Sequence, residues 1–302
     1  MFPPFLIIFY RAFTHFLNLF TWIIFVIRSM RKKEEWIRKK ERFGIVDIFD
    51  KADNYIWFHA ASVGELLSIK PLVQKLLNEN YDILITTTTV SSANLFKKVF
   101  PDSVKHQYIP YDTPKYTKRF LNRLNIELAI FVESEIWPNF IMECKKRNIP
   151  LLLINARFSD KSFQYWGYAK KSLNYLLGSF KFILPQNTKT HNWFKKLGYE
   201  NIEFLGNIKH DAEKLEINND KLEALKKSIS NKKIILAAST HHGEEEIIFS
   251  LFNKLKLEED NLILIIAPRH PERAEFISDL AIKKCFKSKQ IKFLSKNDEI
   301  SY

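Results

Sequence analysis

The first candidate for chemistry is a carboxylate at a junction between an expected strand and an expected helix. Residues 59–65 have the sequence His-Ala-Ala-Ser-Val-Gly-Glu, which places Glu65 in the first helical turn. The small residues Ser62 and Gly64 let a ligand approach a helix N-terminus, where free N–H groups favour anions or hydroxyls. Two interpretations are open. Glu65 either acts as a general base toward an acceptor hydroxyl or only complements the helix dipole.

Two further junctions in the first half of the chain also carry polar side chains. Four threonines, Thr86 to Thr89, end the expected strand 82–86, where they either cap the next helix or donate hydrogen bonds to a sugar or phosphate. Glu133 and Glu135 follow the expected strand 128–132, either as a solvated pair or as part of a site. The carboxyl ends of parallel strands meet at one edge of a sheet, so we expect these groups to converge.

The C-terminal part of the chain has polar junctions of its own. After the expected strand 234–238, Ser239 or Thr240 can cap the helix that follows. The adjacent His241 and His242 suggest a zinc ligand pair. Neighbouring residues seldom bind the same ion, so no metal site is expected.

A basic pair lies at the next strand end. Arg269 and His270 follow the expected strand 262–266 and suit a phosphate, because a guanidinium group matches two phosphate oxygens at once. Asn207 and Lys209 lie at the crossing between the two halves of the chain and can reach the same anion. Anion-seeking residues at so many strand ends favour a nucleotide-sugar cleft.

Short apolar runs alternate with amphipathic stretches along the first part of the body. This βα alternation predicts an α/β protein with a parallel sheet and helices on both faces. The predicted strands are 55–59, 82–86, 128–132, 151–154, 182–184 and 202–205, and the predicted helices are 64–78, 93–99 and 139–146.

A second βα series follows Gly206, after a polar and charged stretch. It predicts the strands 234–238, 262–266 and 291–294 and the helix 244–255. Two series predict two Rossmann-like domains that face a cleft, residues 31–205 and 206–302. A doubly wound domain usually has five or six strands, so we expect the second domain to be incomplete.

The composition favours an anionic partner. The chain has 302 residues with 47 Lys and Arg against 34 Asp and Glu, a formal net charge of +13. Such a field attracts nucleic acid or an acidic membrane surface. The two cysteines, Cys144 and Cys285, lack CxxC spacing, which argues against a disulfide framework and fits a reducing cytosol.

The N-terminus has the pattern of a membrane anchor. Residues 2–27 are almost wholly apolar, with Arg11 and His15 as interruptions. If helical, this stretch nearly spans a bilayer, and we expect residues 1–30 to be the anchor; a buried amphipathic helix is the alternative. The basic residues that follow place the body on the cytoplasmic side and make a nucleic-acid partner the weaker interpretation. They are Arg28, Arg31, Lys32, Lys33, Arg38, Lys39, Lys40 and Arg42.

The order and spacing of eight motifs resemble the Kdo transferases of lipopolysaccharide synthesis, which transfer 3-deoxy-D-manno-octulosonic acid (Kdo). The resemblance extends over residues 1–299 and includes the apolar N-terminus. The motifs are residues 59–65, 86–93, 109–114, 132–139, 154–162, 206–211, 238–245 and 267–273.

This resemblance implies a glycosyltransferase-B fold, and transfer of Kdo from CMP-Kdo to a lipid A precursor at the cytoplasmic side of the inner membrane. No metal or other cofactor is implied. Glu65 would deprotonate the acceptor hydroxyl, which attacks the anomeric carbon with inversion. The implied acceptor-binding residues are Ser62, Gly64, Thr88, Glu133 and Glu135, and the implied donor-binding residues are Asn207, Lys209, Ser239, Thr240, His241, Arg269 and His270.

Members of this family continue with a Gly-Glu-Leu motif and a Gly-rich segment of the His-Asn-Pro-Leu-Glu type that holds the donor. These motifs are not found in the 302 residues, so we expect a fragment or a truncated gene product. Two alternatives stay open. One is an inactive remnant that binds membrane or lipid A, and the other is a related membrane glycosyltransferase with another donor.

Overall fold

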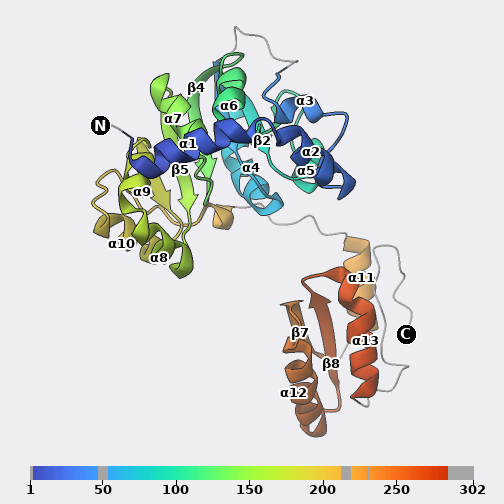
Figure 1. Ribbon diagram of the computed structural model, residues 1–302. Helices are drawn as coiled ribbons and strands as arrows, with labels where there is room; N and C mark the ends of the chain where they lie inside the picture. The colour runs from blue at the N-terminus through green and yellow to red at the C-terminus, as the bar shows by residue number, and fades with distance from the viewer. Residues whose placement is uncertain (1–2, 47–53, 212–218, 230–231, 285–302) are drawn as a thin grey trace. The chain divides into compact units, whose positions relative to one another are not determined.

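A computed structural model describes residues 3–46, 54–211, 219–229 and 232–284, and the chain divides into two compact units (Figure 1). The first unit is 1–213 and the second is 214–302. Residues 206–211 were expected to open the second domain but belong to the first unit. They do so because Ile208 packs against a hydrophobic cluster of the first unit and Lys209 pairs with Glu133.

The first unit is built on a six-stranded parallel sheet with the strand order β3-β2-β1-β4-β5-β6. This is the doubly wound order, in which the winding reverses between β1 and β4. The predicted α/β class with a parallel sheet is therefore confirmed. The strands are β1 (Asn54–His59), β2 (Asp82–Thr87), β3 (Lys105–Tyr108), β4 (Asn125–Val132), β5 (Leu151–Ala156) and β6 (Phe182–Pro185).

Helices cover both faces of this sheet, and side chains of each strand alternate between two cores. In β1, Tyr55 and Trp57 belong to one cluster, whereas Ile56 and Phe58 belong to the other, as the two-residue period of a strand requires. One core is closed by α4 (Val63–Asn78) and α5 (Val90–Val99). The other is closed by α6 (Pro114–Leu121), α7 (Pro138–Lys146) and α9 (Lys170–Leu177). The remaining helices are α8 (Asp160–Tyr168), α10 (Thr188–Lys196) and the 3-10 helix η1 (Ile208–Asp211).

Two strands differ from the expectation. The predicted strand 202–205 makes only one isolated bridge, between Ile202 and Ile183, and the residues after it are exposed without a neighbouring strand in the described part of the chain. The strand β3 was not predicted because its sequence Lys-His-Gln-Tyr is polar. Its His106 is accommodated by Thr87 and Arg38. The predicted strand 291–294 lies outside the described residues.

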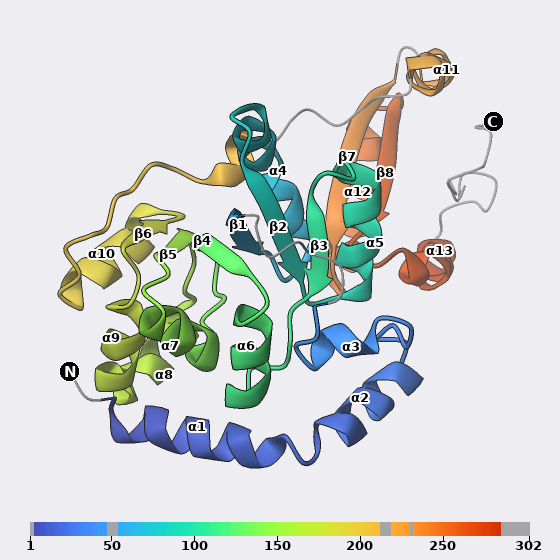
Figure 2. The same ribbon diagram turned by 90° about the horizontal axis from the view of Figure 1, so that it is seen from above.

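The apolar N-terminus forms two helices, α1 (Phe5–Leu17) and α2 (Thr21–Met30), which run alongside the first unit (Figure 2). Among the described residues no single helix is long and apolar enough to cross a membrane. The two helices meet that criterion only together, by length and composition, and they are bent by 71°.

The polar side chains of these helices bind the body of the unit. The Tyr10 hydroxyl donates to Asp112 Oδ2 at 2.9 Å, and Asn139 Nδ2 donates to Thr14 Oγ1 at 3.1 Å. The Thr21 hydroxyl lies 2.8 Å from the Tyr116 hydroxyl. The side of α1 and α2 that faces the unit is therefore specified by long-range hydrogen bonds.

The basic segment after α2 is partly neutralised within the chain. Arg28 and Arg42 both bind the buried Glu34 at 2.7 Å, and Arg38 binds Glu41 at 2.6 Å in α3 (Lys39–Arg42). Arg42 is 3% exposed and also donates to the Ile109 carbonyl at 2.9 Å. Three of the basic residues that were expected to face lipid thus hold this segment against the unit.

In residues 219–229 and 232–284, the second unit has two parallel strands flanked by helices. β7 (Lys233–Thr240) pairs with β8 (Leu262–Pro268), and Phe249, Ile277 and Ala281 form a small core with partly buried residues of β8. The other elements are α11 (Asn219–Ser228), α12 (Glu244–Glu258), the 3-10 helix η2 (Pro271–Arg273) and α13 (Ala274–Lys283).

Gly44 provides a test of how the segment after α3 packs. Its φ is +73°, and a Cβ atom there would lie 2.4 Å from the Tyr116 carbonyl oxygen. We expect Gly44→Ala to destabilise the first unit by at least about 2 kcal/mol, from the left-handed backbone and the clash with main-chain atoms. Urea unfolding followed by tryptophan fluorescence measures this. Gly167→Ala is the control, since its Cβ meets nothing within 4 Å; equal losses in both variants would contradict the argument.

Candidate active site

The candidate site lies at the carboxyl ends of β1 and β4, where the winding of the sheet reverses. Ligands of doubly wound sheets bind in the crevice that opens at this point. His59 is the last residue of β1, and Glu133 and Glu135 follow β4. The ends of β1 and β4 come together as predicted, because His59 Nε2 lies 3.3 Å from Glu135 Oε2.

Glu65 is held in the first turn of α4 by a capping arrangement. Ser62 is the N-cap, and its Oγ accepts from Glu65 N at 3.3 Å. The Glu65 carboxylate accepts from Ser62 Oγ at 2.8 Å and from Ala61 N at 2.7 Å. Gly64 leaves open space beside this turn, since a Cβ there would meet nothing within 4 Å.

Burial sets the chemistry of Glu65, whose exposure is only 8%. Desolvation raises its pKa above the usual value for glutamate. The hydrogen bond from Ser62 opposes this shift, and the negative charges of Glu135 and Glu133 reinforce it. A carboxylate with a raised pKa binds a proton more strongly, which suits a general base. The helix-capping role and the base role are thus compatible.

Glu135 is positioned by two aromatic side chains. Trp137 Nε1 donates to Glu135 Oε2 at 2.6 Å, and His59 Nε2 lies 3.3 Å from the same oxygen. His59 is fully buried, and its Nδ1 lies 3.1 Å from the Thr86 carbonyl oxygen. Sequence reasoning gave His59 no role, although its place at the end of a strand and the start of a motif was a usable signal.

Glu133 is paired with a residue that was assigned to the donor. Lys209 Nζ lies 2.5 Å from Glu133 Oε1, within the first unit. Asn207 Oδ1 accepts from Lys209 N at 3.0 Å, so both residues belong to one turn, which lies beside Glu133. Thr88 N donates to the Ala61 carbonyl at 3.3 Å, which places Thr88 next to the Glu65 turn.

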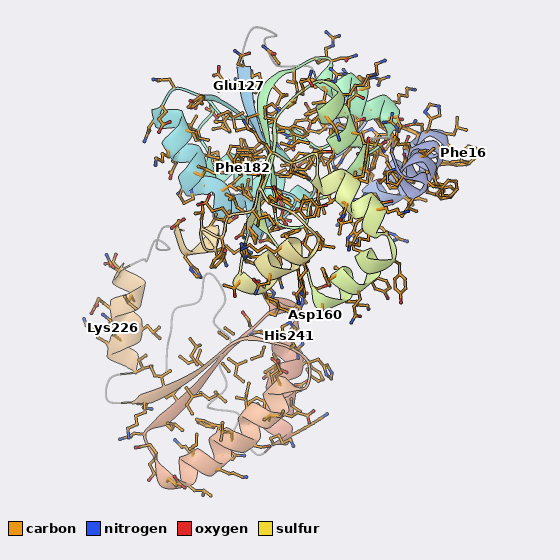
Figure 3. The ribbon with its side chains drawn as sticks, turned by 90° about the vertical axis from the view of Figure 1, so that its left-hand side faces the viewer. Phe16, Glu127, Asp160, Phe182, Lys226 and His241 are labelled. Carbon is orange, nitrogen blue, oxygen red and sulfur yellow. The ribbon has the colours of Figure 1, made fainter. Side chains whose placement is uncertain are left out.

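The other predicted donor residues belong to the second unit. Ser239 has a φ of 60° at an irregularity near the end of β7, and the exposed His241 follows it (Figure 3). Arg269 and His270 are exposed after β8, and Arg269 N donates to the Thr240 carbonyl at 3.1 Å. These side chains are exposed, and the two histidines each lie near a carboxylate: His241 Nδ1 is 3.8 Å from Glu244 and His270 Nδ1 is 3.7 Å from Glu272. The Thr240 hydroxyl donates to Glu245 Oε1 at 2.8 Å.

A buried ion pair supports this second loop cluster. Glu245 is fully buried and binds Arg273 Nη2 at 2.9 Å, while Arg273 Nη1 donates to the Thr240 carbonyl at 3.2 Å. Burial by itself would raise the pKa of Glu245, but the hydrogen bonds from Arg273 and Thr240 outweigh it and hold that pKa below its usual value. The sequence analysis did not predict this ion pair between Glu245 and Arg273.

Within the described ranges, no three His, Cys, Asp or Glu side chains come together in a group that could hold a metal ion.

Solved structures share this architecture. A putative UDP-N-acetylglucosamine 2-epimerase from Listeria monocytogenes aligns with a TM-score of 0.56 at 14% identity, covering 82% of this chain and 70% of that one. A glycosyltransferase from Rickettsia africae aligns with a TM-score of 0.53 at 12% identity, covering 77% and 66%. The likeness confirms the predicted α/β fold of the glycosyltransferase-B type.

Sequence relatives define the family more closely. Residues 38–212 match the family described as 3-deoxy-D-manno-octulosonic-acid transferase (kdotransferase), and the chain belongs to this family. A 3-deoxy-D-manno-octulosonic acid transferase of Rickettsia bellii is 40% identical over 264 residues, 86% of this chain and 62% of that protein. The Haemophilus influenzae enzyme of the same name is 38% identical over 76% of this chain and 55% of its own length. The chain thus spans somewhat over half the length of these relatives.

The Glu245–Arg273 pair yields a stability prediction for the second unit. We expect Arg273→Met to cost about 3 kcal/mol, because it leaves a buried carboxylate without its partner. Lys226→Met is the matched control, since Lys226 pairs with Glu223 at 3.0 Å with both side chains exposed, and such pairs contribute less than about 1 kcal/mol. Hydrogen exchange of β7 and α12 amides reports on this unit. Similar losses of amide protection in both variants would show that the buried ion pair does not stabilise the second unit.

Proposed function

We propose that the protein transfers Kdo from CMP-Kdo to a sugar hydroxyl of a lipid A precursor, with inversion at the anomeric carbon. The observation that carries this proposal is the buried Glu65 carboxylate at the switch point of the sheet, in a chain of the Kdo-transferase family. The relatives from Rickettsia and Haemophilus that bear this enzyme name support the choice of sugar.

The proposed reaction is a single displacement. Glu65 takes the proton of the acceptor hydroxyl, and the hydroxyl oxygen forms a bond to the anomeric carbon of Kdo. The bond from that carbon to the CMP phosphate oxygen breaks, and its electron pair leaves with CMP. Arg269, His270 and His241 are the proposed partners of the phosphate, because they are exposed at the strand ends of the second unit.

The acceptor is proposed to bind on the first unit beside Glu65. Glu133 and Glu135 lie close enough to raise the pKa of Glu65, so a sugar ring bound there meets several carboxylate acceptors. Gly64 and Ser62 leave the backbone of the α4 turn accessible. A sugar with several hydroxyl donors suits this acidic edge.

We propose that α1 and α2 lie in the plane of the inner membrane, on its cytoplasmic side, instead of crossing it. The polar atoms of these helices already bind the unit through Tyr10, Thr14 and Thr21. The opposite sides are apolar and exposed, with Phe16 on the outer side of the helices in Figure 3. A helix that is apolar on its outer side and followed by basic residues favours an interfacial position. The exposed apolar residues are Phe5, Leu6, Ile8, Phe9, Phe13, Phe16, Leu19, Phe20, Trp22, Ile23, Ile24 and Ile27.

The base role is tested by Glu65→Gln, which keeps the shape of the side chain and removes its basicity. We expect Kdo transfer to a lipid A precursor to fall by about 100-fold or more, since a general base contributes that much. Glu79→Gln is the control, because Glu79 caps the other end of α4 and is exposed. Transfer by Glu65→Gln within about tenfold of the wild type would assign the base to another residue.

The interfacial position is tested by vesicle co-sedimentation. We expect the double substitution Phe13→Glu with Phe16→Glu to lower binding to vesicles of anionic phospholipid by at least about tenfold, because it places two charges on the apolar side. Leu257→Glu in α12 is the control, as Leu257 is 89% exposed but belongs to the second unit. Unchanged binding by the double variant would contradict the proposed membrane face.

A further inference from the structure

The ion pair between Lys209 and Glu133 joins two segments that are far apart in the sequence. Glu133 is the first residue after β4 and has a φ of 58°, a conformation that non-glycine residues seldom adopt. Its side chain is 13% exposed, and its Oε1 lies 2.5 Å from Lys209 Nζ. A strained backbone at a strand end persists only when surrounding contacts hold it, and such residues concentrate at functional sites.

The turn that presents Lys209 is built for this contact. Gly206 has a φ of +105°, and Asn207 Oδ1 accepts from Lys209 N, which closes the turn. Ile208 packs against the hydrophobic cluster that contains Val132 and Ile154, at the ends of β4 and β5. The turn is thus anchored to the first unit by an apolar residue, and Lys209 follows directly on that anchor.

Glu65 is surrounded by other carboxylates, and a positive charge near them would favour the ionised form of each. Glu133 and Glu135 face Glu65 from the end of β4, and Ser62 Oγ and Ala61 N face it from its own turn. Glu135 itself is contacted by His59 from β1 and by Trp137, the N-cap of α7. Lys209 brings a charge to Glu133 from η1.

We propose that Lys209 is a positioning residue of the first unit, which holds Glu133 in place and balances the carboxylates around Glu65. This differs from the expectation that Lys209 binds the phosphate of the donor. Its ammonium group is already at 2.5 Å from a carboxylate oxygen, and a nearby positive charge makes the ionised form of neighbouring carboxylates more favourable. Lys209 thereby keeps Glu65 available as a base. The inference rests on the proposed function for its kinetic test only.

The kinetic test is the pH dependence of kcat/KM for Kdo transfer in Lys209→Met. Removing the ammonium group leaves the Glu133 charge unbalanced, which raises the pKa of Glu65 further. The acid limb of the profile, where kcat/KM falls because Glu65 becomes protonated, therefore moves to higher pH. We expect kcat/KM at these acidic pH values to fall roughly threefold to tenfold and to recover at higher pH, since loss of one nearby unit charge changes an ionisation equilibrium by about that much. Lys209→Arg keeps the charge and should keep the limb in place.

The double variant Lys209→Met with Glu133→Gln isolates the charge effect. An uncharged amide at position 133 needs no counter-charge, so we expect its acid limb to return toward that of the wild type. A purely structural role for Lys209 would instead lower the rate at every pH without moving the limb. A higher KM for CMP-Kdo with an unmoved limb would overturn the inference and assign Lys209 to the donor.

A second measurement does not depend on turnover. Carbon-13 NMR of protein labelled at the glutamate carboxyl, with Glu65→Gln to assign the signal, follows the ionisation of Glu65 directly. The inference requires the Glu65 titration to move to higher pH in Lys209→Met, and an unmoved titration overturns it. If the wild type transfers no Kdo but the Glu65 titration still moves to higher pH in Lys209→Met, the proposed function is refuted and the inference stands.

Discussion

The site depends on one constraint, the reversal of winding on either side of β1. This strand is hydrogen-bonded to β2 on one side and to β4 on the other, both in parallel. The chain segments that follow the three strands therefore leave from the same edge of the sheet. Residues 55–59 are buried on both faces, so this geometry is held by the core of the unit. The turn that carries Glu65 and the loop that carries Glu133 and Glu135 meet for this reason.

The same constraint concentrates negative charge. Carboxylates brought together and partly buried disfavour one another's ionisation, and each needs donors or a counter-charge. Glu65 receives hydrogen bonds from Ser62 and Ala61, Glu135 one from Trp137, and Glu133 an ion pair with Lys209. These donors come from three segments of the chain: the turn before α4, the start of α7 and η1. The arrangement of Glu65, Glu133 and Glu135 thus depends on several segments of the first unit. The ionisation of each carboxylate depends on the hydrogen-bond donors and the counter-charge that it receives.

Much of the fold follows from sequence because the central strands are continuous apolar runs, such as residues 55–58. The edge strand β3 escaped prediction because Lys105 to Tyr108 are polar and are stabilised by pairing with β2. At the site, the parallel-strand rule was enough to predict that Glu65, Glu133 and Glu135 converge. The partner of Lys209 could not be predicted, since it depends on where the hydrophobic contact of Ile208 anchors the turn. Hydropathy likewise cannot show that the partners of α1 lie more than a hundred residues away.

A buried carboxylate connects the N-terminal helices to the acidic loop. Asp112 accepts from Tyr10 of α1 at 2.9 Å and from the Asn139 and Phe140 N–H groups at 3.1 and 3.0 Å, at the start of α7. Burial raises the pKa of Asp112 to about 6, and these hydrogen bonds act in the opposite direction by favouring the ionised form. The helix α7 begins directly after the loop that carries Glu133 and Glu135. Asp112 thus joins α1 to the start of α7, on the C-terminal side of the loop that carries Glu133 and Glu135.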